Sequence, residues 1–260
     1  MKPRLARIVL VLPIMQPESP VEPARPAAPQ PLRIGGLVPF TATDYPDALA
    51  AVVFCQGCPW SCAYCHNPHL RPVRGDDEHD FARIVEWLET RRGLLDAVVF
   101  SGGEPTAQAA LVEATATVRA LGYAVGLHTG GAYPRRLAKL LPQIDWVGID
   151  MKAPGAHYAA VTGVAGSGRA ALASLDLVLA AGVGYEVRTT VHPDVTGPDV
   201  LDELARELAA RGIIRWILQP FRPTGCANVD LVAAAPQGVT LAPDLLARLS
   251  AHVPVIEVRG

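Results

Sequence analysis

The sequence has no run of about 20 apolar residues, the length that a membrane-spanning helix requires. Its net charge of −2 offers no broad basic surface for nucleic acid. It has only five cysteines in 260 residues, too few and too clustered for a secreted disulfide scaffold. We therefore expect a cytoplasmic protein that has neither nucleic acid nor a membrane as a partner.

The first 32 residues differ in composition from the rest of the chain. They contain 8 of the 24 prolines, and Pro13 cuts the apolar run 8–12 to less than a secretory signal needs. We predict a disordered, proline-rich leader over residues 1–32 and one domain over residues 33–260.

From Arg33 onward, strand-like runs alternate with helical patterns, which is typical of a parallel sheet with crossover helices. The predicted strands are 51–54, 97–100, 124–127, 146–149, 186–191, 214–218 and 255–258. The predicted helices are 81–90, 107–121, 134–141, 170–181, 200–211 and 243–252. No glycine-rich GxGxxG turn opens a helix, so we predict an α/β fold with a partial (β/α)6 TIM-like barrel, and a doubly wound sheet is the alternative.

Four of the five cysteines lie within residues 51–66, AVVFCQGCPWSCAYCH. Cys58, Cys62 and Cys65 are spaced Cx3CxxC, close enough for one loop to wrap an iron–sulfur cluster. A 4Fe–4S cluster held by three thiolates keeps one iron open to an outside ligand. Two CxxC pairs, which begin at Cys55 and Cys62, make a zinc knuckle the alternative, although zinc pairs usually lie farther apart. We interpret Cys55 as a buried residue at a strand end and Cys226 as a loop residue.

Polar or glycine-rich segments follow the predicted strands, and in a barrel such segments meet at one rim. They are Ser101–Pro105, His128–Gly131, Asp150 with Lys152, Arg188 with His192, and Gln219–Arg222. Glycines allow the backbone to approach a ligand closely, and carbonyls or Glu104 can accept hydrogen bonds from an ammonium group. As an isolated feature, a glycine loop like Ser101–Pro105 is most often a turn. A surface ion pair is a fair alternative for Asp150 with Lys152, and an arginine paired with a carboxylate at a strand end is one for Arg188.

The Cx3CxxC spacing, followed by Gly102-Gly103-Glu104-Pro105 after a strand, resembles the radical S-adenosylmethionine (radical SAM) superfamily. The resemblance implies a barrel of the radical SAM type. It also implies that Cys58, Cys62 and Cys65 are catalytic and hold a 4Fe–4S cluster, whose fourth iron binds S-adenosylmethionine. The cofactor-binding residues that the resemblance implies are Tyr64 for the adenine, Gly102, Gly103 and Glu104 for the amino group, and Asp150, Lys152 and Arg188. His128 either donates or accepts a hydrogen bond with S-adenosylmethionine or makes hydrogen bonds only within its own loop.

The Asp150-x-Lys152 pair, Arg188 and the segment Tyr64–Pro68 resemble activating enzymes of glycyl radical enzymes, above all anaerobic ribonucleoside-triphosphate reductase activating proteins. The implied activity is reductive cleavage of S-adenosylmethionine to a 5'-deoxyadenosyl radical, which takes hydrogen from a glycine of the partner enzyme. Flavodoxin or ferredoxin would supply the electron.

Two other functions stay open at this point. One is a radical SAM enzyme that acts on a small molecule, like carboxy-deazaguanine synthase, and the other is a non-catalytic metal-binding module. The chain also departs from the family pattern at Asp47, which replaces a common glycine and is expected to alter the local turn.

Overall fold

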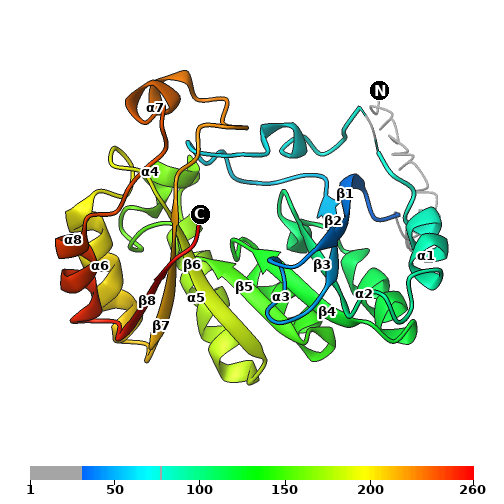
Figure 1. Ribbon diagram of the computed structural model, residues 1–260. Coiled ribbons are helices and arrows are strands. Elements are labelled where there is room, and N and C mark those ends of the chain that lie inside the picture. Colours follow the sequence, from blue (N-terminus) through cyan, green and yellow to red (C-terminus); the bar gives the residue numbers. More distant parts are fainter. Residues whose placement is uncertain (1–30, 77) are drawn as a thin grey trace, which may run out of the picture.

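Eight strands form a single sheet whose order follows the chain (Figure 1). The computed structural model describes residues 31–76 and 78–260. The strands are β1 (Ile34–Thr41), β2 (Ala50–Cys55), β3 (Ala97–Gly102), β4 (Ala124–Thr129), β5 (Trp146–Asp150), β6 (Gly184–Val191), β7 (Arg215–Pro220) and β8 (Val255–Val258). β1 pairs antiparallel with β2, and every later neighbouring pair is parallel. Because β1 and β8 are the two edges of the sheet, the barrel is partial, as predicted.

The longer helices cover the outer face of the curved sheet (Figure 1). They are α1 (Phe81–Glu89), α2 (Leu111–Ala120), α3 (Pro134–Leu140), α5 (Ser167–Ala181), α6 (Pro198–Ala209) and α8 (Pro243–Ser250), with the shorter α4 (Tyr158–Thr162) and α7 (Val229–Ala234). Three 3-10 turns are η1 (Pro68–Leu70), η2 (Pro105–Ala107) and η3 (Leu141–Gln143). Local signals set several ends: the Asp80 carboxylate caps α1 by accepting from Ala82 N, and Gly182 ends α5 in the left-handed conformation.

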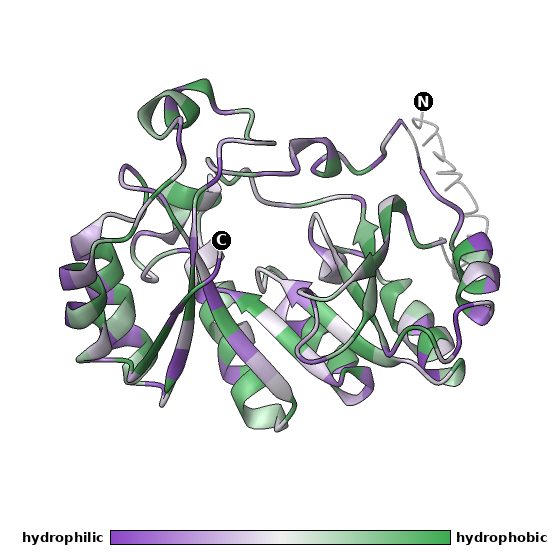
Figure 2. Cartoon of the chain, in the orientation of Figure 1, coloured by the Kyte–Doolittle hydropathy of each residue, from purple (hydrophilic) through white to green (hydrophobic). Residues whose placement is uncertain are grey.

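The main core lies between the sheet and its outer helices. Val98, Phe100 and Val147 are fully buried on the face that meets these helices. Hydrophobic colour runs along the central strands in Figure 2, as expected for parallel strands that are covered on both faces. The continuous apolar runs of the sequence therefore predict these strands well.

The segment between β1 and β2 packs against the inner face of the sheet. The Tyr45 ring lies 5.6 Å from that of Trp146, and a Cβ on Gly126 would be only 3.0 Å from the Tyr45 ring. Asp47 has φ 54°, and it is the only non-glycine residue in the described part of the chain with positive φ. Asp47 thus adopts the conformation that glycine favours, so the turn is kept at some cost in backbone strain.

The sequence misses β1, α4 and α7, and predicts the other helices and strands with small errors at their ends. Within the ranges that the structure describes, no helix is both long enough and apolar enough to cross a lipid bilayer. The predicted leader lies outside the described residues except for its last two positions, so it stays a prediction.

Candidate functional site

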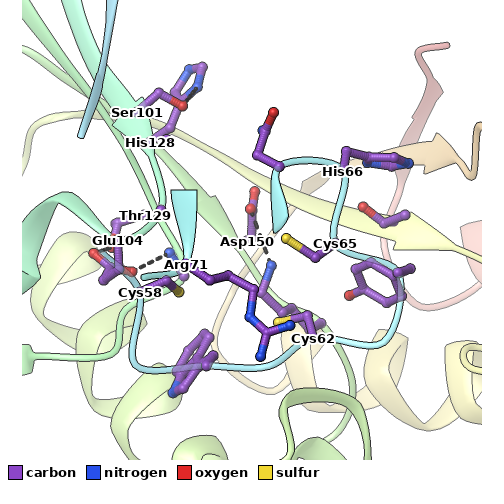
Figure 3. Close-up of a pocket in the computed structure, with 18 of the residues that line it drawn as sticks. Cys58, Cys62, Cys65, His66, Arg71, Ser101, Glu104, His128, Thr129 and Asp150 are labelled. Atoms are coloured by element: carbon purple, nitrogen blue, oxygen red, sulfur yellow. Dashed lines mark hydrogen bonds and ion pairs between the residues drawn. The ribbon is translucent and has the colours of Figure 1, made fainter. Parts of the chain in front are cut away.

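The carboxyl ends of β3 to β6 and the loop of residues 56–67, here the cysteine loop, surround a pocket of about 190 Å³ (Figure 3). The structure brings together every residue for which a catalytic or cofactor-binding role is predicted. Those lining the pocket are Cys58, Cys62, Tyr64, Cys65, Gly102, Gly103, Glu104, His128, Asp150, Lys152 and Arg188.

Backbone hydrogen bonds hold the cysteine loop at two places. Near its start, Cys58 N donates to the carbonyl of Arg71 at 3.0 Å. Farther along, Ser61 N donates to the carbonyl of Thr162 at 2.8 Å, at the end of α4. The unpredicted helix α4 is therefore part of the frame that shapes the loop between its cysteines.

The three thiols of the cysteine loop line one pocket without forming a single-ion site. Among residues 31–76 and 78–260, no three His, Cys, Asp or Glu side chains converge in a way that could hold one metal ion. Cys55 is fully buried at the end of β2, as predicted, and does not line the pocket, so the first CxxC pair of a zinc knuckle is not formed. The pocket is thus lined by three cysteines, the number that holds a 4Fe–4S cluster with one open iron, and not by four.

Burial also controls the protonation of these thiols. It raises the pKa of Cys58 to about 12, with the Glu104 carboxylate adding to the shift, and it raises the pKa of Cys62. Metal ligands must be thiolates, so binding a cluster here has to release protons from these groups.

Glu104 is bound on all sides by the chain itself. Its carboxylate is 1% exposed, and Oε1 accepts hydrogen bonds from Thr106 N at 3.1 Å, Thr106 Oγ1 at 2.6 Å and Thr129 Oγ1 at 2.7 Å. Oε2 accepts from Gly130 N at 3.0 Å. Glu104 thus ties the loop after β3 to the loop after β4, and four donors use most of its capacity to accept.

The two glycines before Glu104 permit a close approach of two backbones. Gly102 has φ 107°, and a Cβ there would lie 2.6 Å from the backbone nitrogen of Cys55. A Cβ on Gly103 would lie 2.5 Å from the carbonyl oxygen of Gly57. Any side chain at either position would push the glycine loop away from the base of the cysteine loop.

His128 uses both ring nitrogens within the protein. Nε2 lies 3.0 Å from the carbonyl oxygen of Asp44, which can only accept, so Nε2 carries the proton. Nδ1 then accepts from Ser101 Oγ at 3.3 Å. Burial, helped by the nearby Arg188 cation, lowers the pKa of His128 to about 3, so the ring is neutral. Of the two predicted roles for His128, this geometry favours the second, in which the ring makes its hydrogen bonds within the protein and not with S-adenosylmethionine.

Asp150, Lys152 and Arg188 form a charged group at the ends of β5 and β6. Asp150 Oδ1 lies 3.0 Å from Arg188 Nε, and Oδ2 lies 3.4 Å from Lys152 Nζ. Burial disfavours the charged forms, but the two cations outweigh it and lower the pKa of Asp150. Burial likewise opposes the charge on Lys152, but the Asp150 carboxylate raises the pKa of Lys152.

A glycine on β5 makes room for the guanidinium of this group. A Cβ on Gly148 would lie 2.7 Å from the guanidinium carbon of Arg188. The arginine can therefore lie flat across β5 and reach Asp150. The group is both an ion pair and part of the pocket wall.

Two polar atoms of the pocket have no hydrogen-bond partner. Three buried side-chain nitrogen or oxygen atoms in the described part of the chain lack one, and Tyr64 Oη and Arg71 Nε are two of them. Both residues line this pocket. Buried polar groups are nearly always bonded, so a concentration of unbonded ones indicates a polar ligand. The thiol set and these atoms together fit a metal cluster with a polar molecule beside it.

Arg71 belongs to the site although it was not predicted there, and His192 does not lie where it was predicted. The turn at η1 brings Arg71 back to the cysteine loop, where its Nη2 donates to Ser61 Oγ at 2.6 Å. No sequence pattern marks this tertiary contact. The expectation that His192 lies on the rim is wrong: it is fully buried, and its Nε2 lies 3.1 Å from the carbonyl of Leu231. Cys226 is a half-buried loop residue with Sγ 3.9 Å from the carbonyl of Ala63.

The chain is similar to proteins of one known family. A family model described as the radical SAM superfamily matches residues 52–210. A protein of Methanocaldococcus jannaschii, provisionally named a glycyl-radical enzyme activating enzyme, is 30% identical over 199 residues, which cover 73% of this chain and 80% of that protein. The pyruvate formate-lyase-activating enzyme of Clostridium pasteurianum is 29% identical over 125 residues, which cover 46% of this chain but only 52% of that protein.

A solved structure gives the same fold at low sequence identity. The structure of Streptococcus suis SuiB bound to its precursor peptide SuiA superposes with a TM-score of 0.60 and 13% identity, over 80% of this chain and 48% of SuiB. At this identity the likeness concerns the fold alone. The chain matches about half the length of SuiB, so it shares the barrel and not the whole architecture.

Proposed function

The chain belongs to the radical SAM superfamily, and from that premise we propose that it is an activating enzyme that generates a glycyl radical in a partner enzyme. Its cofactors are those of the superfamily, a 4Fe–4S cluster and S-adenosylmethionine. The partner in this proposal is an anaerobic ribonucleoside-triphosphate reductase, and the electron donor is flavodoxin or ferredoxin. The proposal places the protein in the cytoplasm, where thiols stay reduced.

One observation carries the proposal: three thiols, a charged group and two partnerless polar atoms line the same pocket. A cluster site alone would need only the thiols. The charged group at the ends of β5 and β6, together with the unbonded atoms of Tyr64 and Arg71, supports a second ligand beside the cluster. This combination suits S-adenosylmethionine, which carries an ammonium, a carboxylate, a ribose and an adenine.

Each part of the pocket has a proposed role. Cys58, Cys62 and Cys65 would hold three irons of the cluster, and the exposed backbone of Gly102 and Gly103 would face the amino group of S-adenosylmethionine. When bound together, these cofactors supply one-electron cleavage of a sulfonium to methionine and a 5'-deoxyadenosyl radical, which removes a hydrogen atom from a glycine Cα.

The surrounding residues would orient the ligands and exclude water. Lys152 and Arg188, held in place by Asp150, would face the carboxylate and ribose, and Tyr64 would contact the adenine. We assign Glu104 a positioning role, because its hydrogen bonds fix the glycine loop. Trp60, which is 4% exposed, closes one wall of the pocket and limits the access of water.

The test is anaerobic reconstitution with iron and sulfide, followed by reduction with S-adenosylmethionine and the candidate reductase. We expect about four irons per chain, as for one 4Fe–4S cluster, then formation of 5'-deoxyadenosine and a glycyl radical doublet in the electron paramagnetic resonance spectrum. Cys62→Ala should abolish all three signals, whereas Cys226→Ala is the matched cysteine control and should keep the iron content.

The possible outcomes test the partner enzyme and the radical chemistry separately. Cofactor cleavage without a doublet would remove the reductase as partner and keep the radical chemistry. One tightly bound zinc and no cleavage would overturn the proposal and favour a metal-binding module.

A further inference from the structure

One cation of the cysteine pocket has no carboxylate partner. The charged side chains of the lining are Arg71, Lys152 and Arg188 against Glu104 and Asp150. Lys152 and Arg188 both pair with Asp150. Within residues 31–76 and 78–260, Arg71 forms no ion pair. The positive charge by which the cations of this lining exceed its carboxylates is therefore that of Arg71.

The side chain of Arg71 is fixed against the segment between the first two cysteines of the site. Its Nη2 donates to Ser61 Oγ at 2.6 Å, and Ser61 directly precedes Cys62 in the sequence. Its backbone holds the same segment, because the carbonyl of Arg71 accepts from Cys58 N at 3.0 Å. Figure 3 shows the Arg71 side chain over the loop between Cys58 and Cys62. The guanidinium therefore lies beside two of the three thiols.

Part of this guanidinium is shielded from water. Arg71 is half-buried as a whole, but its Nε is fully buried and has no hydrogen-bond partner. A charge at the boundary of a water-poor pocket acts more strongly on its neighbours than a charge in bulk solvent, because less of its field is screened. The charge of Arg71 is thus placed where it can influence the charge of a group held by the thiols.

A 4Fe–4S cluster at these thiols brings negative charge into the pocket. The three ligands are thiolates, and reduction adds one further electron. The reduction potential of such a cluster depends on its net charge, on hydrogen bonds to its sulfurs and on its exposure to solvent. An unpaired cation beside the thiolates favours the reduced state. Lys152 and Arg188 contribute less to this effect, since Asp150 offsets their charges.

We propose that Arg71 is the counter-cation of the reduced cluster, and that its charge makes the cluster easier to reduce. This inference rests on the proposed function and adds a residue that sets the potential of its cluster. The step concerned is the transfer of one electron from a low-potential donor to the cluster, in which no covalent bond forms or breaks. Arg71 acts through its charge, so its unbonded Nε stays available to the second ligand of the pocket.

Redox titration of the reconstituted protein without S-adenosylmethionine tests the proposal. The ratio of reduced to oxidised cluster at a fixed solution potential is measured from the electron paramagnetic resonance signal of the reduced cluster. Arg71→Gln should lower this ratio about tenfold, which for one electron is a fall in potential of about 59 mV. Arg71→Lys keeps the charge, and its ratio should stay within about threefold of the wild-type ratio.

Two further variants separate the position of the charge from its presence. Arg74→Gln is the matched control, because Arg74 is an exposed arginine of the same segment that does not line the pocket, and its ratio should not change. Ser61→Ala keeps the charge of Arg71 but removes the hydrogen bond that fixes it, so the ratio should fall by less than in Arg71→Gln. If Arg71→Gln takes up too little iron, Ser61→Ala decides: a lowered ratio supports the proposal, and an unchanged ratio overturns it.

A wild-type ratio in Arg71→Gln would overturn the proposal. An equal fall in Arg74→Gln would also overturn it, because the effect would then be one of net charge alone. Cleavage of S-adenosylmethionine by the wild-type protein is measured in parallel. A cluster that supports cleavage but has the same potential in Arg71→Gln counts against the role of Arg71 alone. A wild-type protein that takes up no cluster counts against both this inference and the proposed function.

Discussion

The two sides of the cysteine pocket use similar residue types but satisfy them differently. On one side, here the fixed side, Glu104 and His128 have both oxygens or both ring nitrogens bonded within the chain. On the other side, here the open side, Tyr64 Oη has no partner, and Asp150 keeps a third of its side chain exposed. Residue type alone therefore does not distinguish a residue that binds a ligand from one that holds the site in shape. What distinguishes them is whether the polar group is buried with all its hydrogen bonds made within the chain, like Glu104, or is left unbonded or partly exposed, like Tyr64 Oη and Asp150.

The largest expected effect tests whether the fixed side is structural. Glu104→Gln would place an NH2 group against donors, leaving buried hydrogen bonds unmade, and should lower the free energy of unfolding by about 3 kcal/mol. Urea denaturation of the cluster-free protein measures this. Glu113→Gln, an exposed glutamate on α2, should change it little. If Glu104→Gln leaves stability unchanged but weakens cofactor binding, then Glu104 binds the cofactor and belongs with the residues of the open side.

The next effect concerns pH and His128. The folded pKa is lowered to about 3, while the unfolded ring titrates near 6.5, so the unfolded state binds the proton more readily between these values. Stability should be constant above pH 6.5 and fall by about 1 to 2 kcal/mol from pH 7 to pH 5. His128→Gln should have a flatter profile by urea denaturation at each pH. Identical slopes would show that His128 is not held neutral.

On the open side, Asp150→Asn should affect chemistry more than folding. Lys152 and Arg188 would lose their shared counter-ion, and we expect about tenfold slower formation of 5'-deoxyadenosine, equal to about 1.4 kcal/mol. The loss of stability should be smaller than that of Glu104→Gln, because Asp150 keeps a third of its side chain exposed whereas Glu104 is buried. Because the pKa of Asp150 is lowered, its stabilisation is present above pH 4 or so and is lost as the pH falls further. A large loss of stability at pH 7 with normal cleavage of S-adenosylmethionine would show that Asp150 has a structural role, like the residues of the fixed side.

The smallest effect has the opposite sign. Tyr64→Phe removes a buried hydroxyl that has no partner, so the cluster-free protein should gain up to about 1 kcal/mol in stability. The same change should weaken S-adenosylmethionine binding severalfold, as measured by equilibrium binding to the reconstituted enzyme. A loss of stability instead would mean that the hydroxyl is satisfied without a ligand.

The sequence predicted most of the barrel, because buried parallel strands appear as continuous apolar runs and their ends as polar segments. The Cx3CxxC spacing and the segment after β3 likewise located the pocket. β1 was not predicted because Gly35, Gly36 and Pro39 interrupt the apolar pattern that marks a strand. The helix α4 has only five residues, too few for a clear helical period.

The roles within the pocket could not be predicted in the same way. Glu104 follows β3 and Asp150 ends β5, so the sequence places both carboxylates at the same rim. Only the fold brings Thr129 and Gly130 to one carboxylate and Arg188 to the other. Arg71 reaches the site through the turn at η1, which depends on tertiary structure.

Within the residues that the structure describes, the sheet ends at β1 and β8, and the form of these edges bears on self-association. An unpaired strand edge can add a strand from another molecule. β1 carries Pro39, which has no N–H to donate, and its pairing with β2 has two register shifts. β8 is only four residues long and is followed by the charged Arg259. Both edges are therefore poor templates for polymerisation, and an incomplete barrel can stay incomplete at high protein concentration without forming edge-to-edge aggregates.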